Sequence, residues 1–349
     1  MSTISAPIAL DQPSTPVETM DTSLAPAATT ITETTTTRAI PRPIYHYRYL
    51  GNYPKDRNTG WSVNMQGVTH DEDNWYFTQT DKLWKFPVGH DLNQEVHGAD
   101  PARGILQVSM PAVMRNLGYN HFGDFDCAIH QLPYQPKKRF LMIATEGEKN
   151  DHKIDPAIAV FRGEDLSFIG HFTIPNQTQF PWCAYNPANK LLYAYMTDEG
   201  RLRAYRPDFI KLFQGEVGFS LVTSYVLKDI RGNRLDFPHP QGGCFTPDGQ
   251  VFFAMNGYYK DTDRDACGIH VFDTNFRRMA HSTNGYGTFN YEFHPGWSAY
   301  EEPEGLTYWD RNDGRSPQIR GCLHAIMNDQ NWPSDDTFYF KHYEKDESL

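Results

Sequence analysis

Apolar runs of strand length recur along most of the chain and alternate with turn sequences. Four of them are rich in aromatic and branched residues: NWYFTQT (74–80), RFLMIAT (139–145), LLYAYMT (191–197) and VFFAMNG (251–257). Turn sequences such as NPANK (186–190) and TPDGQ (246–250) separate neighbouring runs. Runs of this kind, bounded by Gly, Pro and Asn, predict β-strands. The pattern therefore favours an all-β protein.

These runs belong to a repeat of about sixty residues. Five short stretches align with one another: QGVTHD from Gln66, DCAIHQ from Asp126, WCAYNP from Trp182, GGCFTP from Gly242 and EGLTYW from Glu304. Their starts are 60, 56, 60 and 62 residues apart. Further strand-like runs follow within the repeats, such as KLWKFPV (82–88) and AIAVFRG (157–163). Four short strands per repeat, arranged radially, are the plan of a β-propeller blade.

The last repeat is too short to form a blade alone, whereas an extra strand-like run precedes the first repeat. This run is IYHYRYL (44–50). A propeller commonly closes when a strand from one end of the chain completes the blade at the other end, which removes two exposed sheet edges. With this closure the chain resembles the five-bladed β-propeller proteins as a group, in architecture and repeat spacing. No motif in it selects one family.

We therefore expect residues 41–349 to form a five-bladed β-propeller closed by an N-terminal strand. A β-sandwich or two smaller β domains are the alternatives, and the nearly equal spacings make them less favourable. Residues 1–40 differ in composition. Of the first 37 residues, 24 are Thr, Ser, Pro or Ala, and none is Lys, Arg or aromatic. Such a segment buries too little apolar surface to fold, so we expect a disordered tail.

Composition and charge restrict the cellular setting and the partners. The N-terminal segment lacks the basic start and apolar core of a secretory signal, and no stretch reaches the roughly 18 apolar residues of a membrane span. We expect a cytoplasmic protein, or one exported without a classical signal peptide, and no transmembrane segment. The formal net charge is −11 without a Lys/Arg cluster, so a nucleic-acid partner is not expected. The five cysteines fit no zinc module or CxxC pair and suit reduced, buried thiols.

Several common kinds of chemistry leave no trace in the sequence. It contains no GxSxG elbow, HExxH pair, Walker loop or GxGxxG turn, which argues against a nucleotide cofactor and the usual serine hydrolases and zincins. Aromatic residues make up 14% of the chain, a content that suits strands and carbohydrate-binding surfaces alike. We expect a monomer that binds a small molecule or a glycan.

The propeller resemblance implies where a site would lie. In these proteins the first strand of each blade lines the central channel, and the loop entering it opens onto one face. The entry loops NHFGDF, FPHPQGG and FHPGWSAYEEPEG would bring polar side chains to one mouth. We expect five catalytic residues, which are His121, Asp124, His239, Glu302 and Glu304. Five ligand-binding candidates are Gln66, Trp182, Gln241, His294 and Trp297. Asp124 is expected at the rim, and Asp126 nearer the channel.

Two kinds of chemistry suit these residues. One is a divalent metal, with Ca²⁺ favoured over Zn²⁺ or Fe²⁺, held by Asp126, Glu304 and Gln66. The other is acid–base catalysis by carboxyl groups in different environments. The alternative for any single residue is a structural role, in which a polar inner-strand side chain bonds a neighbouring strand. The acidic stretches TEGEKNDHKID (145–155) and DTDRDACG (261–268) fit solvated loops that rim the same mouth.

The combined expectation is an enzyme with a single site at one mouth of the channel. It would act on a small polar or carbohydrate-like substrate by hydrolysis, elimination or isomerisation, with or without a metal. The alternative is a glycan-binding, lectin-like or exported effector propeller without catalytic activity. The aligned positions Gln66, Asp126, Trp182, Gly242 and Glu304 all differ. This asymmetry favours one central site over one equal lectin site per blade.

Overall fold

The computed structural model describes residues 44–55, 60–257, 268–281, 288–289, 301–331 and 335–346. Three sequence-based expectations fall outside these residues: the tail (1–40), the candidates His294 and Trp297, and nearly all of DTDRDACG. The contacts group Arg42–Leu349 into one unit, to which the following description refers.

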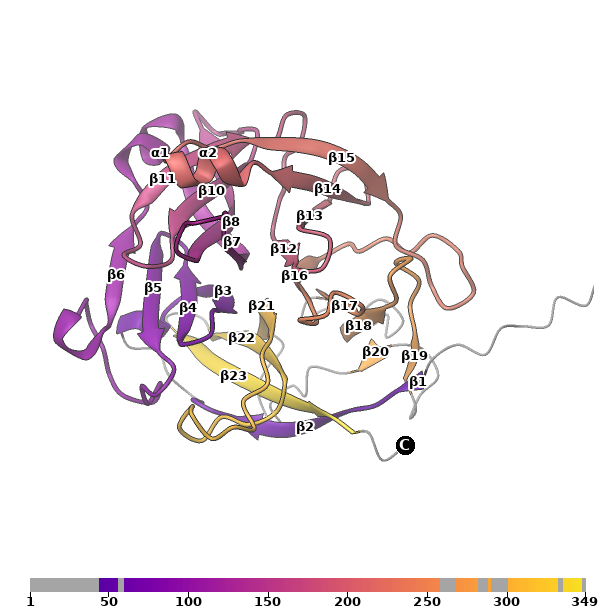
Figure 1. The fold of residues 1–349 in the computed structure, drawn as a ribbon. Helices are drawn as coiled ribbons and strands as arrows, with labels where there is room; N and C mark the ends of the chain where they lie inside the picture. Colours follow the sequence, from indigo (N-terminus) through magenta and orange to yellow (C-terminus); the bar gives the residue numbers. More distant parts are fainter. Residues whose placement is uncertain are drawn as a thin grey trace, which may run out of the picture. The chain divides into compact units, whose positions relative to one another are not determined.

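Five antiparallel sheets, each with four strands on its main path, make up this unit (Figure 1). Blade 1 contains β3 (Met65–His70), β4 (Asn74–Gln79), β5 (Lys82–Pro87) and β6 (Leu106–Ser109). Blade 2 contains β7 (Tyr119–His130), β8 (Lys138–Lys149), β10 (Ala157–Arg162) and β11 (Phe168–Thr173), with β9 (His152–Lys153) beside β8. Blade 3 contains β12 (Cys183–Asn186), β13 (Leu191–Met196), β14 (Arg201–Pro207) and β15 (Phe219–Tyr225).

Blade 4 contains β16 (Pro240–Phe245), β17 (Phe252–Asn256), β18 (Gly268–Phe272) and β20 (Thr288–Phe289). Blade 5 contains β21 (Glu301–Tyr308), β22 (Leu323–Asn331), β23 (Asp335–Lys345) and β2 (Tyr47–Asn52). Short helices lie in the connections: η1 (Gly60–Ser62), η2 (Pro101–Arg103), α1 (Ala112–Leu117) and α2 (Phe209–Gln214). No helix among the described residues is long and apolar enough to cross a membrane.

The blades form a closed ring. Each inner strand contacts the next in the cycle β3, β7, β12, β16, β21 and back to β3. The N-terminal strand β2 pairs antiparallel with β23, with Tyr49 opposite Tyr343, and so completes blade 5. A shorter strand, β1 (Ile44–Tyr45), pairs in parallel with β19 (Ala280–His281). The predicted five-bladed propeller and its closure by an N-terminal strand are thus confirmed.

The hydrophobic core lies between the blades rather than inside any one of them. Five clusters of buried side chains occupy the described residues, and each combines residues from two neighbouring blades. At the junction of blades 1 and 5, the fully buried Trp61 ring lies 5.0 Å from Phe77 and 5.3 Å from Phe338. Burying one such aromatic side chain stabilises the fold by about 2 kcal/mol. A blade therefore depends on its neighbours for its own core.

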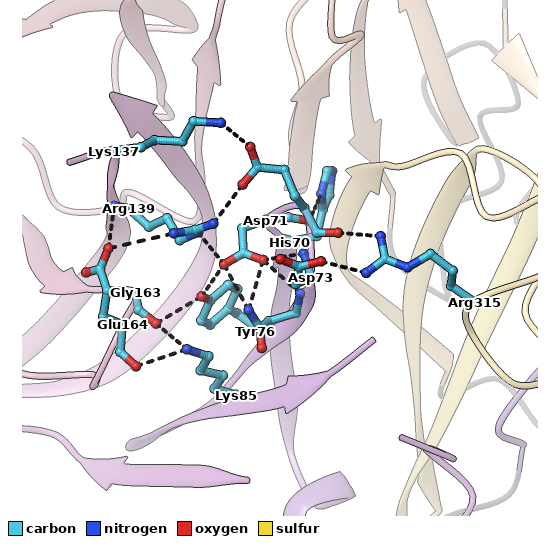
Figure 2. A network of polar contacts seen from close by, with 12 residues as sticks. His70, Asp71, Asp73, Tyr76, Lys85, Lys137, Arg139, Gly163, Glu164 and Arg315 are labelled. Carbon is cyan, nitrogen blue, oxygen red and sulfur yellow. Dashed lines mark hydrogen bonds and ion pairs between the residues drawn. The ribbon is translucent and has the colours of Figure 1, made fainter. Parts of the chain in front are cut away.

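A polar network fastens the turn after the first inner strand to both neighbouring blades (Figure 2). The buried Asp71 carboxylate accepts hydrogen bonds from the Asp73 N–H (2.7 Å) and the Tyr76 hydroxyl (2.7 Å). Arg139 of blade 2 pairs with Asp71 at 2.8 Å, and Arg315 of blade 5 pairs with Asp73 at 2.6 Å. We assign this network a structural role, because its carboxylates are bound by backbone N–H groups and by arginine side chains from adjacent blades.

Candidate active site at one mouth of the channel

A cavity of about 330 Å³ lies at one end of the ring of inner strands, a volume within the usual range for small-molecule sites. Its walls include six of the residues predicted from the sequence, which are Gln66, His121, His239, Gln241, Glu302 and Glu304. The others are Gly123, Glu146, Gln179, Phe180, Pro181, Thr197, Pro238 and Pro240. We call this space the mouth cavity. Its polar residues come from different blades, as the repeat alignment predicted.

Bulges in the inner strands place several of these side chains. The extra residue is Gln66 in β3 and Gln241 in β16, and a third irregularity includes Glu304 in β21. A bulge turns its side chain out of the regular alternation, and such irregularities are frequent next to active sites. β7 carries a corresponding irregularity at Gly123 and Asp124. Because the bulges lie at equivalent positions in the inner strands of different blades, side chains from distant repeats meet in one cavity.

A chain of polar contacts crosses the mouth cavity from blade 2 to blade 5. His121 Nε2 lies 2.7 Å from Gln66 Oε1, and Gln66 Nε2 lies 3.5 Å from Glu304 Oε1. Asn328 Nδ2 approaches the same Glu304 oxygen at 3.4 Å. An amide oxygen only accepts hydrogen bonds, so His121 carries its hydrogen on Nε2 and keeps its lone pair on Nδ1. Both amide groups donate to Glu304 Oε1.

Burial moves the pKa values of both ends of this chain toward the neutral forms. The Glu304 side chain is 8% exposed, and burial together with the charges of Glu302 and Asp124 raises its pKa well above the ordinary range. The bonds from Asn328 and Gln66 oppose this rise. Burial, and to a smaller extent the charge of Lys153, lowers the pKa of His121. These pKa shifts favour the neutral carboxylic acid at Glu304 and the neutral imidazole at His121, and both residues line the mouth cavity.

A second carboxyl group lies two residues earlier on β21 in different surroundings. Glu302 is only partly buried, and Gln241 Nε2 donates a hydrogen bond of 2.9 Å to its Oε1. His239 lines the same wall, and its backbone N–H donates to Asn256 Oδ1 at 3.0 Å. The two carboxyl groups that β21 contributes to the cavity thus differ in burial and in hydrogen-bond partners.

Glu146 is a cavity residue that the list of candidates did not include. It belongs to the acidic stretch 145–155, which was expected to rim this mouth, and its carboxylate accepts a hydrogen bond from the Phe180 N–H. Burial raises its pKa, while the Phe180 bond and Lys153 oppose the rise. The signal that could have found Glu146 is the pairing of β7 with β8, which puts it opposite His121.

Asp124 lies deeper than the rim position expected from the sequence. Its side chain is fully buried, and it is absent from the walls of the mouth cavity. The backbone N–H groups of Val68 and Leu306 donate to its carboxylate, each at 3.1 Å. Burial raises the pKa of Asp124 well above the ordinary range, and these backbone bonds oppose the rise. A group so enclosed does not touch a ligand in the mouth cavity, so the rim position is corrected.

Asp126 lies two residues beyond Asp124 on β7, away from the mouth cavity. The bulge of β7 falls at Gly123 and Asp124, so Asp126 is not the counterpart of Gln66 that the alignment suggested. Its oxygens accept bonds from the Thr69 hydroxyl (2.9 Å) and the Tyr185 N–H (2.8 Å). It lines a second cavity of about 190 Å³, whose walls are His70, Asp126, Cys127, Ile129, Tyr185, Pro187, Cys244, Phe245, Pro247, Thr307 and Tyr308.

The three residues predicted to hold a metal are therefore divided between two cavities. Gln66 and Glu304 line the mouth cavity, whereas Asp126 lines the second one. Within the described parts of the chain, no group of three or more His, Cys, Asp or Glu side chains is placed to hold a metal ion. Gln66, Glu304 and Asp126 therefore do not lie together as ligands of one metal ion.

Trp182 was a candidate for stacking against a ligand, but its ring is fully buried. It lies against Tyr195, with ring centroids 6.1 Å apart, and a Cβ on Gly243 would approach the ring to 2.7 Å. Trp182 therefore packs between blades 3 and 4. The four cysteines within the described residues are free and buried, as the sequence predicted, and burial raises the pKa of Cys127 well above its ordinary range.

Comparisons with known proteins show likeness in the fold alone. No family model and no curated protein matches the chain. A solved complex of KlAtg21 with the coiled coil of AgAtg16 contains a chain with TM-score 0.37 and 9% identity, covering 77% of this chain and 67% of that one. A structural genomics protein of unknown function from Bacteroides thetaiotaomicron has TM-score 0.36 and 11% identity, with coverage of 86% and 76%. A chain of a nidogen/laminin complex has TM-score 0.37 and 12% identity, with coverage of 78% and 97%.

Proposed function

We propose that this propeller is an enzyme whose single site is the mouth cavity, and that it catalyses proton transfer to and from a small polar or carbohydrate-like substrate. The reaction class is hydrolysis, elimination or isomerisation, each of which general acid and general base groups can accelerate. Glu304 is the proposed acid and His121 the proposed base.

The observation that carries this proposal is the difference between Glu302 and Glu304. Two carboxyl groups of one site take separate roles when their environments move their pKa values apart. Glu304 is 8% exposed, and burial raises its pKa well above the ordinary range, which favours the protonated form that an acid catalyst needs. Glu302 is partly exposed and bound by Gln241, which suits a group that orients the substrate or stabilises positive charge.

His121 suits the role of the base. Burial lowers its pKa, so the imidazole is neutral at pH 7 and able to accept a proton. Its bond to Gln66 assigns the hydrogen to Nε2 and the free lone pair to Nδ1. The shared partner Gln66 links base and acid and fixes their relative orientation.

The lining of the cavity indicates the substrate class. Amide groups of Gln66 and Gln241 and the carboxyl groups of β21 offer both donors and acceptors, the combination that hydroxyl groups require. A small polyhydroxylated molecule fits such a wall better than an apolar one. A divalent metal at this mouth stays a prediction, and the check is metal analysis of the purified protein with thermal melting in chelator.

The test starts from ligand discovery. Purified protein is screened by thermal shift against monosaccharides, sugar acids, lactones and small glycosides, and each ligand found is incubated with enzyme while products are followed by NMR. Glu304→Gln, His121→Gln and the surface control Glu164→Gln are compared with the wild type. Loss of one proton-transfer group is expected to lower kcat by about 10² to 10⁴-fold. Glu164→Gln should leave turnover unchanged, because Glu164 lies outside the cavity wall.

The outcomes separate the proposal from its alternative. Turnover that falls in both site variants, with ligand affinity retained, supports acid–base catalysis. Binding without turnover for every ligand found would support the lectin-like alternative and contradict the enzyme. Turnover equal to the wild type in folded Glu304→Gln would remove the proposed acid.

A further inference from the structure

We infer that Asp124 is the positioning residue of the mouth cavity: one carboxylate at the centre of the channel fastens the three strand segments that carry Gln66, Gln241 and Glu304. The inference rests on the proposed function only for its effect on turnover. Its structural part concerns backbone bonds and can be tested without a substrate.

The backbone bonds of Asp124 follow one rule of spacing. Its donors are the N–H groups of Val68 (3.1 Å), Gly243 (3.4 Å) and Leu306 (3.1 Å). Each donor lies two residues after a bulged cavity residue: Val68 after Gln66, Gly243 after Gln241 and Leu306 after Glu304. The carboxyl group of Asp124 therefore binds the backbone of three blades. In each blade the bond lies two residues along the chain from a side chain of the mouth cavity.

Glycines clear the space that this carboxylate occupies. A Cβ on Gly67 would approach Asp124 Oδ1 to 2.9 Å, and one on Gly242 or Gly305 would approach a carboxylate oxygen to 3.0 Å. These glycines stand between each cavity residue and its donor N–H, where β7 has Asp124 itself. One inner strand, β7, thus carries the carboxyl group, and three others carry glycines that let their backbones approach it.

Asp124 also acts on the charge of Glu304. The groups that face Glu304 are the carboxyl groups of Glu302 and Asp124 and the amides of Gln66 and Asn328. The two acids raise the pKa of Glu304 and the two amides lower it. Removing the acid at position 124 should therefore lower the pH at which Glu304 ionises. Because buried acids titrate as coupled groups, this shift is a property of the pair.

Asp126 provides a matched control on the same strand. Its carboxylate also accepts a backbone bond from another blade, from Tyr185 N–H at 2.8 Å. It lines the second cavity instead of the mouth cavity, and the largest influences on the pKa of Glu304 include Asp124 but not Asp126. Asp124→Asn and Asp126→Asn both remove a buried carboxyl group, but only the first removes one that holds the site.

The experiment is a pair of double-mutant cycles. Unfolding midpoints in urea are measured from pH 4 to pH 8 for the wild type, Asp124→Asn, Glu304→Gln and their double variant, and again with Asp126→Asn in place of Asp124→Asn. At each pH the urea midpoint of Glu304→Gln is compared with that of the wild type. The difference should grow in favour of Glu304→Gln as pH rises, because the substitution removes a buried acid whose ionisation destabilises the fold. In the Asp124→Asn background this gain should be smaller and should level off at a lower pH, because it begins at the unfolded-state pKa and ends at the folded-state pKa. In the Asp126→Asn background it should stay closer to the wild type than in the Asp124→Asn background, because Asp126 acts on Asp124 but is not among the largest influences on Glu304.

A second measurement keeps the inference testable when Asp124→Asn does not fold. Amide hydrogen exchange of the wild type should then place Val68, Gly243 and Leu306 in the slowest class, because a buried carboxylate binds all three. Fast exchange at these amides, or equal coupling of Glu304 to positions 124 and 126, would overturn the inference. A further outcome separates the inference from the proposed function. If Glu304 is coupled more strongly to position 124 than to position 126, but Asp124→Asn keeps the full kcat and KM, the positioning role of Asp124 stands. The proposed function would then need an acid other than Glu304.

Discussion

The two ends of the central channel are built from the same inner strands but carry different chemistry. β3 presents Gln66 to the mouth cavity and His70 to the second cavity, and β16 presents Gln241 to the first and Phe245 to the second. The mouth cavity is lined mainly by amide, imidazole and carboxyl groups. The second is lined largely by aromatic rings, prolines and thiols around one carboxyl group. Asp124 lies between them, fully buried.

The difference follows from strand geometry. At the mouth end the inner strands are bulged, so that Gln66, Gln241 and Glu304 depart from the regular alternation. Beyond the bulges the strands alternate regularly and pack against their neighbours, as Cys244 does in the core between blades 4 and 5. The bulges therefore direct polar side chains toward one end of the channel, whereas the other end is formed by regular packing.

The largest effect is expected from closing the space at the centre of the channel. In Gly67→Ala the new Cβ would lie 2.7 Å from the Asp124 Cα and 2.7 Å from Thr78 Oγ1. Overpacking against backbone should lower the free energy of unfolding by about 3 kcal/mol. The control is Gly98→Ala, whose Cβ meets no atom within 4 Å and should change stability by less than about 0.5 kcal/mol. Equal stability of the two variants in urea would show that the centre is not tightly packed.

A smaller effect concerns the carboxyl group of the second cavity. Burial raises the pKa of Asp126 from 3.8 to about 6, against the bonds from Tyr185, Cys127 and Thr69. A raised folded-state pKa contributes stability below the ordinary value, and this contribution is lost as pH rises through the folded pKa. Relative to wild type, Asp126→Asn should therefore gain about 1–3 kcal/mol between pH 4 and pH 7. A constant difference between the two proteins across this range would contradict the raised pKa.

The smallest effect concerns the thiols of the second cavity. Cys127 is 8% exposed and Cys244 3% exposed, and burial raises the pKa of each well above its ordinary range. At pH 7.5 both should react with iodoacetamide at least about tenfold more slowly than a free thiol. Peptide mapping by mass spectrometry, with guanidinium-unfolded protein as the reference, measures each site separately. Reaction at the unfolded rate would mean that this end of the channel is open.

Much of the fold could be predicted from the sequence because blades repeat. Spacings of 60, 56, 60 and 62 residues indicated five blades, and the unplaced run 44–50 indicated the closing strand. The same alignment found Gln66 and Glu304, which stand at the bulges of their strands. His121 and His239 followed from the loops that enter inner strands.

Register within a strand was less predictable. A bulge adds one residue, and a pattern of period two does not reveal where it is added. The alignment therefore matched Asp126 to Gln66, although the bulge of β7 lies at Gly123 and Asp124. Glu146 was missed because its place beside His121 depends on pairing between β7 and β8. The burial of Trp182 depends on packing between blades, which the composition of one strand does not encode.

The central claim is that Glu304 is a protonated acid facing the mouth cavity, and its titration tests this most directly. Protein labelled with ¹³C at the glutamate side-chain carboxyl carbon is titrated by NMR from pH 3 to pH 9, and the Glu304 signal is assigned by its loss in Glu304→Gln. We predict a titration midpoint for this carbon well above the ordinary glutamate value of 4.5. A midpoint in the ordinary range near 4.5 would contradict it, because Glu304 would then be ionised at neutral pH.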